Sequence, residues 1–227
     1  MITSRFIFLK IGFRESAACF RQGMIGYLPS LFFIFVCVLF PLTMSPEIRL
    51  LQQIGPGVIW IALLLAHLLS LPRLWEEDYS DGALDQLLLA PGPLPFYLGV
   101  KILTHWFIVT VPMILLSPVM ALLFHLSGYA MMILIASLLL GTPLLYFQGA
   151  MIAALCLSVQ QGMLLLAILL LPLYIPIVIL GSAVVDAAEK NMSFASPMAL
   201  LGALLCLAMS IGPRILAFAV RTSIEYS

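Results

Sequence analysis

Apolar runs of about 20 residues restrict what this sequence can fold into, because a helix of that length crosses the hydrocarbon core of a bilayer. Charged residues make up only 9% of the 227-residue chain, whereas soluble domains carry roughly 25%. The chain therefore lacks the polar groups to cover itself in water, and we predict an all-α integral membrane protein forming one domain. Six segments predict transmembrane helices, at residues 25–44, 54–72, 102–124, 131–157, 163–185 and 194–213.

Two of these segments contain residues that interrupt helices. Segment 131–157 is too long for one straight span and contains Gly141, Pro143 and Gly149, and segment 163–185 contains two prolines. Proline removes a backbone donor and clashes with the preceding turn. We therefore predict a kink or a break in the first segment and a bend in the second.

The basic residues gather on one side of the predicted topology. The smaller group is Arg49 and Lys190. The larger group of eight lies in the N-terminal segment, in the loop between the second and third spans, and near the C-terminus: Arg5, Lys10, Arg14, Arg21, Arg73, Lys101, Arg214 and Arg221. The positive-inside rule places this larger group in the cytoplasm, so we predict that both termini are cytoplasmic.

The N-terminal segment, residues 1–22, is amphipathic when read as a helix. Its charges recur along the segment instead of preceding one apolar core, which is not the pattern of a cleavable signal. We predict a helix in the headgroup layer of the membrane, with a cytoplasmic helix packed on protein as the alternative. The apolar stripe is formed by Ile2, Phe6, Leu9, Phe13 and Phe20.

Half of the ten acidic residues lie in segment 73–95, between the second and third spans. Read as a helix, this segment places Trp75 and Tyr79 on one face and acidic side chains on the opposite face. Gly82 predicts a turn near residues 80–82, after which Asp81 would cap a short second helix with an exposed leucine ridge. Three prolines then end that helix.

An acidic amphipathic segment is repelled by the negative cytoplasmic leaflet. An apolar ridge with carboxylates around it favours docking of a cytoplasmic protein, and a solvated loop kept out of the bilayer by its charge is the alternative. The predicted docking residues are Glu76, Glu77, Asp78, Asp81, Gly82, Leu84, Asp85, Leu87, Leu88 and Pro91.

Patterns for chemistry within the chain are scarce. The sequence has no phosphate-binding G-x-x-x-x-G-K-[ST] loop, so a nucleotide would be bound by a partner. We predict no catalytic residue and no metal site, and the zero net charge gives no field for nucleic acid. The cysteines lack ligand spacing and are interpreted as packing residues, and they are Cys19, Cys37, Cys156 and Cys206.

The three histidines occupy different depths. His67 lies in the middle of the second span, as a lone polar group that must find a partner or stay neutral. His105 lies beside Trp106 near the cytoplasmic start of the third span, and His125 lies at its outer end. In the outer loop before the last span, Asp186 is predicted to cap a short helix, with contact to a periplasmic partner as the alternative.

Several motifs resemble known transporter families. The loop pattern from Asp78 through Gly82 and Leu84 to Pro91, followed by Lys101, resembles membrane subunits of ABC-2-type transporters. Six stretches in order resemble the haem exporter protein B family (CcmB), the membrane subunit of the cytochrome c maturation ABC transporter. They are FPLTMSPE, IGPGVIWIALLLAHLLSL, DGALDQLLLAPGPLP, KILTHW, LLLGTP and LLPLYIPIVILGSAVVDAA.

This resemblance implies a six-helix ABC-2-type permease in the bacterial inner membrane. It implies a dimer that works with a separate ATP-hydrolysing A subunit, a haem-handling C subunit and a small D subunit. Segment 73–95 would be the coupling helix that docks on the ATPase. A haem chaperone is the implied periplasmic partner. Haem is a possible substrate, with His105 and Trp106 as candidate contacts, although axial ligation suits the C subunit better.

The functional alternatives remain open at this point. ATP hydrolysis would drive either haem export through the dimer or release of haem-loaded chaperone from the C subunit. The second is favoured, because no ladder of haem-ligating side chains follows one span. An exporter of drugs or glycolipids, a passive scaffold and a membrane enzyme are the other readings.

Overall fold

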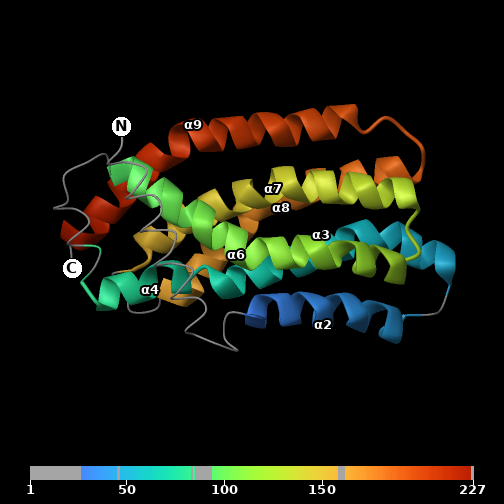
Figure 1. Cartoon of the computed structure of the whole chain (residues 1–227), viewed down its shortest axis with the longest axis horizontal. Coiled ribbons are helices and arrows are strands. Elements are labelled where there is room, and N and C mark those ends of the chain that lie inside the picture. Colours follow the sequence, from blue (N-terminus) through green and yellow to red (C-terminus); the bar gives the residue numbers. More distant parts are fainter. Residues whose placement is uncertain (1–26, 45–46, 83, 85–93, 158–161, 226–227) are drawn as a thin grey trace.

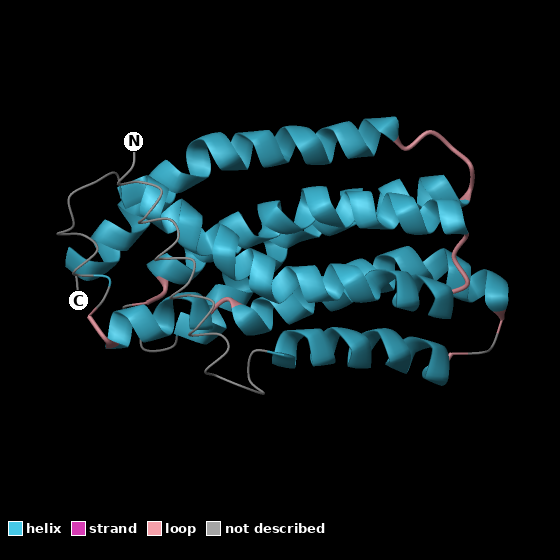
Figure 2. Ribbon diagram, in the orientation of Figure 1, coloured by secondary structure: helices cyan, strands magenta, loops and turns pink. Residues whose placement is uncertain are grey.

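The computed structural model describes residues 27–44, 47–82, 84, 94–157 and 162–225. Within these ranges the regular structure is entirely helical, and the long helices run side by side in one elongated bundle (Figure 1, Figure 2). The predicted all-α architecture is confirmed. The helices are α2 (Leu28–Thr43), α3 (Ile48–Ser70), α4 (Arg73–Ser80), α6 (Leu94–Leu123), α7 (Gly128–Leu155), α8 (Gly162–Glu189) and α9 (Ala195–Glu225).

Five helices of the described chain are long and apolar enough to cross a membrane, judged by length and composition. The first of them runs from Ile48 to Glu76 and so takes in α3 and the start of α4; the others correspond to α6, α7, α8 and α9. The remaining predicted span, residues 25–44, begins outside the described residues. Its described part, α2, has 16 residues, which corresponds to a rise of about 24 Å against a hydrocarbon core of about 30 Å.

The fourth span was predicted to contain a kink or a break; it is not broken, and a kink in it stays a prediction. Helix α7 is one helix from Gly128 to Leu155, with Pro143 inside it. Its glycines serve packing instead, because a Cβ at Gly141 would overlap the ring of Trp60, and a Cβ at Gly149 would overlap Tyr174 and Leu71. Helix α8 likewise continues through both of its prolines.

The helices also extend further than hydropathy predicts. Helix α6 begins at Leu94, eight residues before the predicted start at residue 102, and α9 continues to Glu225, beyond the predicted end at residue 213. Lys101 does not end the apolar region, because its side chain is buried and paired. Pro95 is tolerated because it lies in the first turn of α6.

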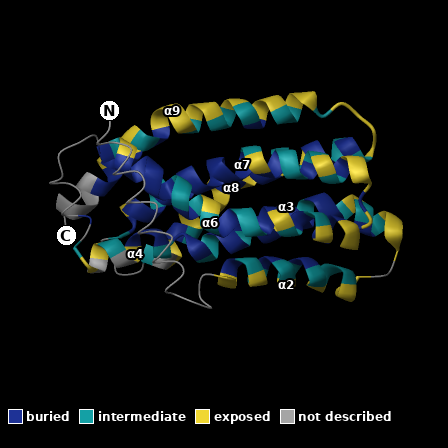
Figure 3. Ribbon diagram, viewed as in Figure 1, coloured by how far each residue is buried: buried dark blue, intermediate teal, exposed yellow. Residues whose placement is uncertain are grey.

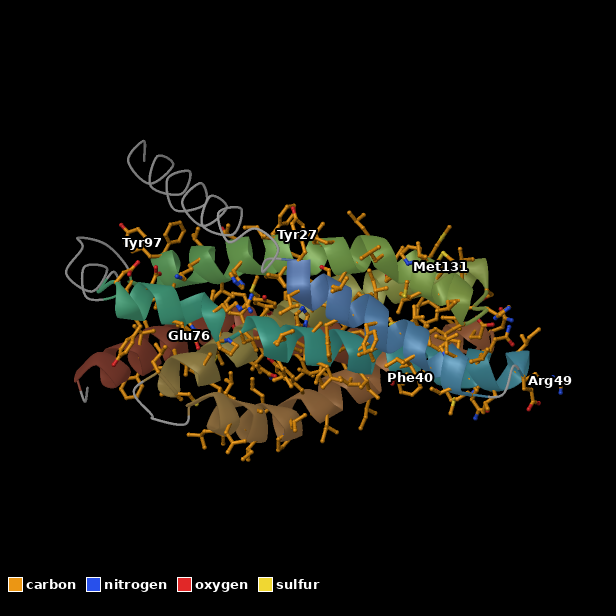
Figure 4. All side chains as sticks on the ribbon, turned by 90° about the horizontal axis from the view of Figure 1, so that it is seen from below. Tyr27, Phe40, Arg49, Glu76, Tyr97 and Met131 are labelled. Atoms are coloured by element: carbon orange, nitrogen blue, oxygen red, sulfur yellow. The ribbon has the colours of Figure 1, made fainter. Side chains whose placement is uncertain are left out.

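The centre of the bundle is formed by α3 and α7, whereas α8 and α9 are more exposed; Figure 3 shows the exposed residues along α9. About two thirds of the apolar window of α3 is buried (67%), against 28% for α9. The outward side chains of α8 and α9 are mostly large and apolar, as expected where lipid is the solvent. The two ends of the bundle differ, since Glu76 of α4 and Arg49 of α3 lie at opposite ends (Figure 4).

Candidate functional site

Helix α4 follows α3 along the chain and lies at one end of the bundle (Figure 1). A tight turn at Leu71 and Pro72 separates it from α3, and the amide of Trp75 donates to the carbonyl of Pro72. The helix ends at Ser80, and Gly82 follows with a φ of 67°, a left-handed conformation that glycine adopts without steric cost. The turn predicted near residues 80–82 is therefore confirmed.

One face of α4 packs on the bundle and the other faces outward. Leu74 and Trp75 are buried, whereas Glu76 and Tyr79 of α4 and Asp81 just after it are exposed. The exposed acidic residues are thus available to a partner. The buried side chains of Leu74 and Trp75 pack this segment against the bundle.

The prediction of an exposed leucine ridge is wrong at Leu84, whose side chain is only 2% exposed and belongs to the hydrophobic core. The chain turns at Gly82, and an apolar side chain next to the bundle gains free energy by burial. The remaining ridge and rim residues, Asp85, Leu87, Leu88 and Pro91, lie outside the described residues, as does the N-terminal segment 1–22. Glu77 lies in α4, but its side chain is also outside the part of the chain that the structure describes.

Two contacts attach α4 to the spans. The indole Nε1 of Trp75 donates to the carbonyl of Ala150 in α7 at 3.0 Å. Asp78 forms an ion pair with Nζ of Lys101 in α6, and the two side chains are 16% and 7% exposed. The same Nζ lies 5.4 Å from the centroid of the Trp75 ring, within the range of a cation–π interaction. Asp78 therefore has a partner within the chain itself.

A buried polar cluster lies further into the bundle, around the hydroxyl of Tyr146 in α7. Ser70 Oγ of α3 lies 2.9 Å from this hydroxyl, and His105 Nδ1 of α6 lies 3.1 Å from it. His67 Nε2 lies 2.9 Å from the hydroxyl of Thr110. The rings of His67 and Tyr146 meet edge to face, with centroids 5.0 Å apart.

The contact with Thr110 confirms the prediction that His67, an isolated polar residue in its span, finds a partner. Sequence reasoning missed its partners because each lies in a different helix, at a position that reads as an isolated polar residue in an apolar run. A local signal was nevertheless present. His67 and Ser70 are three residues apart, and Lys101 and His105 are four apart, spacings that place each pair on one helix face.

The candidate haem contacts His105 and Trp106 both face neighbouring helices. His105 is 7% exposed and meets Tyr146, while Trp106 Nε1 donates to the hydroxyl of Thr142 in α7 at 3.0 Å. Their side chains are therefore engaged by the protein. A haem contact at either residue stays a prediction.

The far end of the bundle holds the remaining predicted residues. Asp186 lies inside α8 and pairs with Lys190 at 2.7 Å, so its predicted capping role is wrong: the helix continues past it to Glu189. The exposed His125 has a φ of 57°, and its carbonyl accepts a hydrogen bond from Gln52 at 2.8 Å. Nearby, the amide and hydroxyl of Ser127 both donate to Glu189 at 2.8 Å.

Comparison with known proteins covers nearly the whole chain. The family model described as CcmB protein matches residues 7–223. Heme exporter protein B of Haemophilus influenzae is 41% identical over 219 residues, which is 96% of this chain and 99% of the relative. Heme exporter protein B of Escherichia coli K12 is 42% identical over 96% of both chains. The Pseudomonas aeruginosa protein of the same name is 40% identical, over 93% of this chain and 95% of its own length.

Proposed function

The chain belongs to the CcmB protein family, and from this premise we propose that it is the membrane subunit of an ABC complex for cytochrome c biogenesis. A separate ATP-binding subunit, the A component, hydrolyses ATP, and this chain couples hydrolysis to the handling of haem. The observation that carries the proposal is the end-to-end match to relatives named heme exporter protein B. The chain itself is not an enzyme in this proposal.

The coupling surface is the outward face of α4 together with the segment that follows it. Three features support this assignment: α4 follows the end of a span, Glu76 on α4 and Asp81 just after it are exposed, and the opposite face of α4 is attached to α6 and α7. A segment that is rigidly attached on one side and acidic on the other suits a cytoplasmic protein partner.

Charge reversal at the exposed acids tests the docking. The double variant Glu76→Lys and Asp81→Lys is expected to reduce co-purification of the A subunit at least about fivefold. In a strain whose own copy of this membrane subunit is deleted, the variant is also expected to lower the amount of mature c-type cytochromes. The control is Asp186→Lys at the far end, which is expected to leave both readouts unchanged.

The same experiment separates the alternatives. Wild-type levels of ATPase binding and cytochrome c in the double variant favour the passive scaffold. Failure of the unaltered chain to restore c-type cytochromes would instead favour an exporter of another substrate, such as a drug or a glycolipid.

We propose that ATP hydrolysis releases haem-loaded chaperone from the C subunit, with passage of haem through the dimer as the alternative. The supporting observation is that His67 and His105, the histidines within the spans, are buried and engaged by Thr110 and Tyr146. A haem-transport assay in vesicles that carry only the A subunit and this chain distinguishes chaperone release from passage of haem through the dimer. ATP-dependent haem accumulation in these vesicles contradicts the release mechanism.

The remaining parts of the proposal concern assembly and location. The chain forms a homodimer in the bacterial inner membrane, associates with the C and D subunits, and has both termini in the cytoplasm. The exposed apolar side chains of α8 and α9 support contact with lipid or with neighbouring subunits. Cross-linking of the assembled complex through cysteines placed on α8 and α9 tests which of these faces is covered by protein.

A further inference from the structure

The ion pair between Asp78 and Lys101 is an unusual feature for a chain with so few charges. Removing a charge from water is costly unless the charge is paired and hydrogen-bonded. Both side chains are largely enclosed, and they come from two different elements, α4 and α6. A solvated loop that only needs charge to stay out of the bilayer has no need for such a pair.

Trp75 attaches α4 to two helices, α6 and α7. Its indole nitrogen donates to the Ala150 carbonyl of α7 while its ring lies against Nζ of Lys101. The short helix α4 is therefore held by α6 and α7 at once. A displacement of α4 that kept these contacts would displace both spans with it.

The attachment continues into the polar cluster. His105 lies one turn after Lys101 on α6, and its Nδ1 meets the hydroxyl of Tyr146 in α7. That hydroxyl also meets Ser70, the last residue of α3. Polar contacts thus link α4, α6, α7 and α3 in sequence, through side chains that are buried in an otherwise apolar bundle.

We propose that Asp78 and Lys101, with Trp75 packed against the pair, are positioning residues that make α4 and α6 move as one body when the ATPase acts. This inference rests on the proposed coupling function and adds to it the residues that transmit the movement. The pair lies on the bundle side of α4, so it acts on the spans and not on the ATPase surface.

Neutralising either partner tests the proposal in the full complex. Asp78→Asn and Lys101→Met are expected to keep A-subunit binding and ATP hydrolysis within about twofold of wild type, while mature c-type cytochromes fall at least about tenfold. The exchanged double variant, Asp78→Lys with Lys101→Asp, is expected to recover most of the yield. The matched control is Asp186→Asn, which removes the exposed ion pair with Lys190 and is expected to change nothing.

Two results overturn the inference. One is a cytochrome yield near wild type in both neutral variants. The other is a parallel loss of subunit abundance, ATPase binding and yield that the exchanged variant does not reverse, because this is the signature of a purely structural pair. If the unaltered chain neither binds the A subunit nor restores c-type cytochromes, the proposed function fails instead.

If the neutral variants do not accumulate, replacing the ion pair between Asp78 and Lys101 by a covalent cross-link still tests the proposal. Asp78→Cys with Lys101→Cys, in a chain whose four native cysteines are changed to alanine, is purified with its partner subunits and treated with a short bis-maleimide. The cross-linked complex is expected to regain ATP-driven release of haem chaperone, and the untreated complex to lack it. Cross-linked complex that hydrolyses ATP without release contradicts the proposal.

Discussion

The hydroxyl of Tyr146 in α7 joins three helices of the bundle, since Ser70 of α3 and His105 of α6 both lie within hydrogen-bond distance of it. In an apolar interior, a buried polar group that loses its partner has no water to replace it. The importance of this residue therefore comes from what it satisfies in its neighbours.

Tyr146→Phe keeps the ring and removes this hydroxyl. We expect the variant to be less stable by about 1–3 kcal/mol, because His105 is left without that partner while remaining buried. Thermal unfolding of the purified protein in detergent measures the effect as a lower Tm. Tyr129→Phe is the control, since Tyr129 is exposed at the start of α7; equal shifts in the two variants would show that the Tyr146 hydroxyl does not stabilise the cluster.

For individual buried residues, the sequence predicts that a partner is needed but does not identify that partner. A histidine in the middle of an apolar span must be paired or neutral, and that expectation holds for His67. Its partner, Thr110, lies 43 residues away along the chain, and no local pattern connects the two. The same applies to Asp78, because its acidic neighbours predict an exposed role and only the arrangement of α4 and α6 shows the ion pair.

For the helices, hydropathy predicts the spans well and their ends poorly. Helix α6 begins before its predicted start because Lys101 is neutralised by a partner that the linear sequence does not show. Helix α7 stays unbroken because its glycines face large side chains of α3 and α8. A glycine in a membrane helix marks either a break or a close approach, and the neighbouring helix decides which.

The packing of Gly181 against the ring of Trp60 tests whether a glycine in these helices marks a close approach. The Trp60 ring is fully buried, and a Cβ on Gly181 of α8 would overlap it. Gly181→Ala is expected to destabilise the bundle by about 1–3 kcal/mol through overpacking. Gly202→Ala in α9 is the matched control, because its Cβ would meet nothing within 4 Å. Thermal unfolding in detergent compares the two, and an unchanged Tm for Gly181→Ala would mean that α3 and α8 separate easily at this point.

At the scale of the whole molecule, the charges at the two ends of the bundle predict its orientation. Arg73 and Lys101 belong to the end formed by α4 and the start of α6, while Arg49 lies at the opposite end (Figure 4). The positive-inside rule assigns the α4 end to the cytoplasm, which is also the side on which an ATP-binding subunit would be found. The orientation of the bundle and the coupling role of α4 therefore depend on each other.

Labelling of single cysteines in intact cells tests this orientation. Arg49→Cys and Lys190→Cys, both at exposed positions, are expected to react with a membrane-impermeant maleimide once the outer membrane is permeabilised. Tyr79→Cys, on the exposed face of α4, is expected to react only after the inner membrane is opened as well. The opposite pattern would place α4 in the periplasm, where no ATPase acts, and would exclude both the docking surface and the positioning role of the ion pair between Asp78 and Lys101.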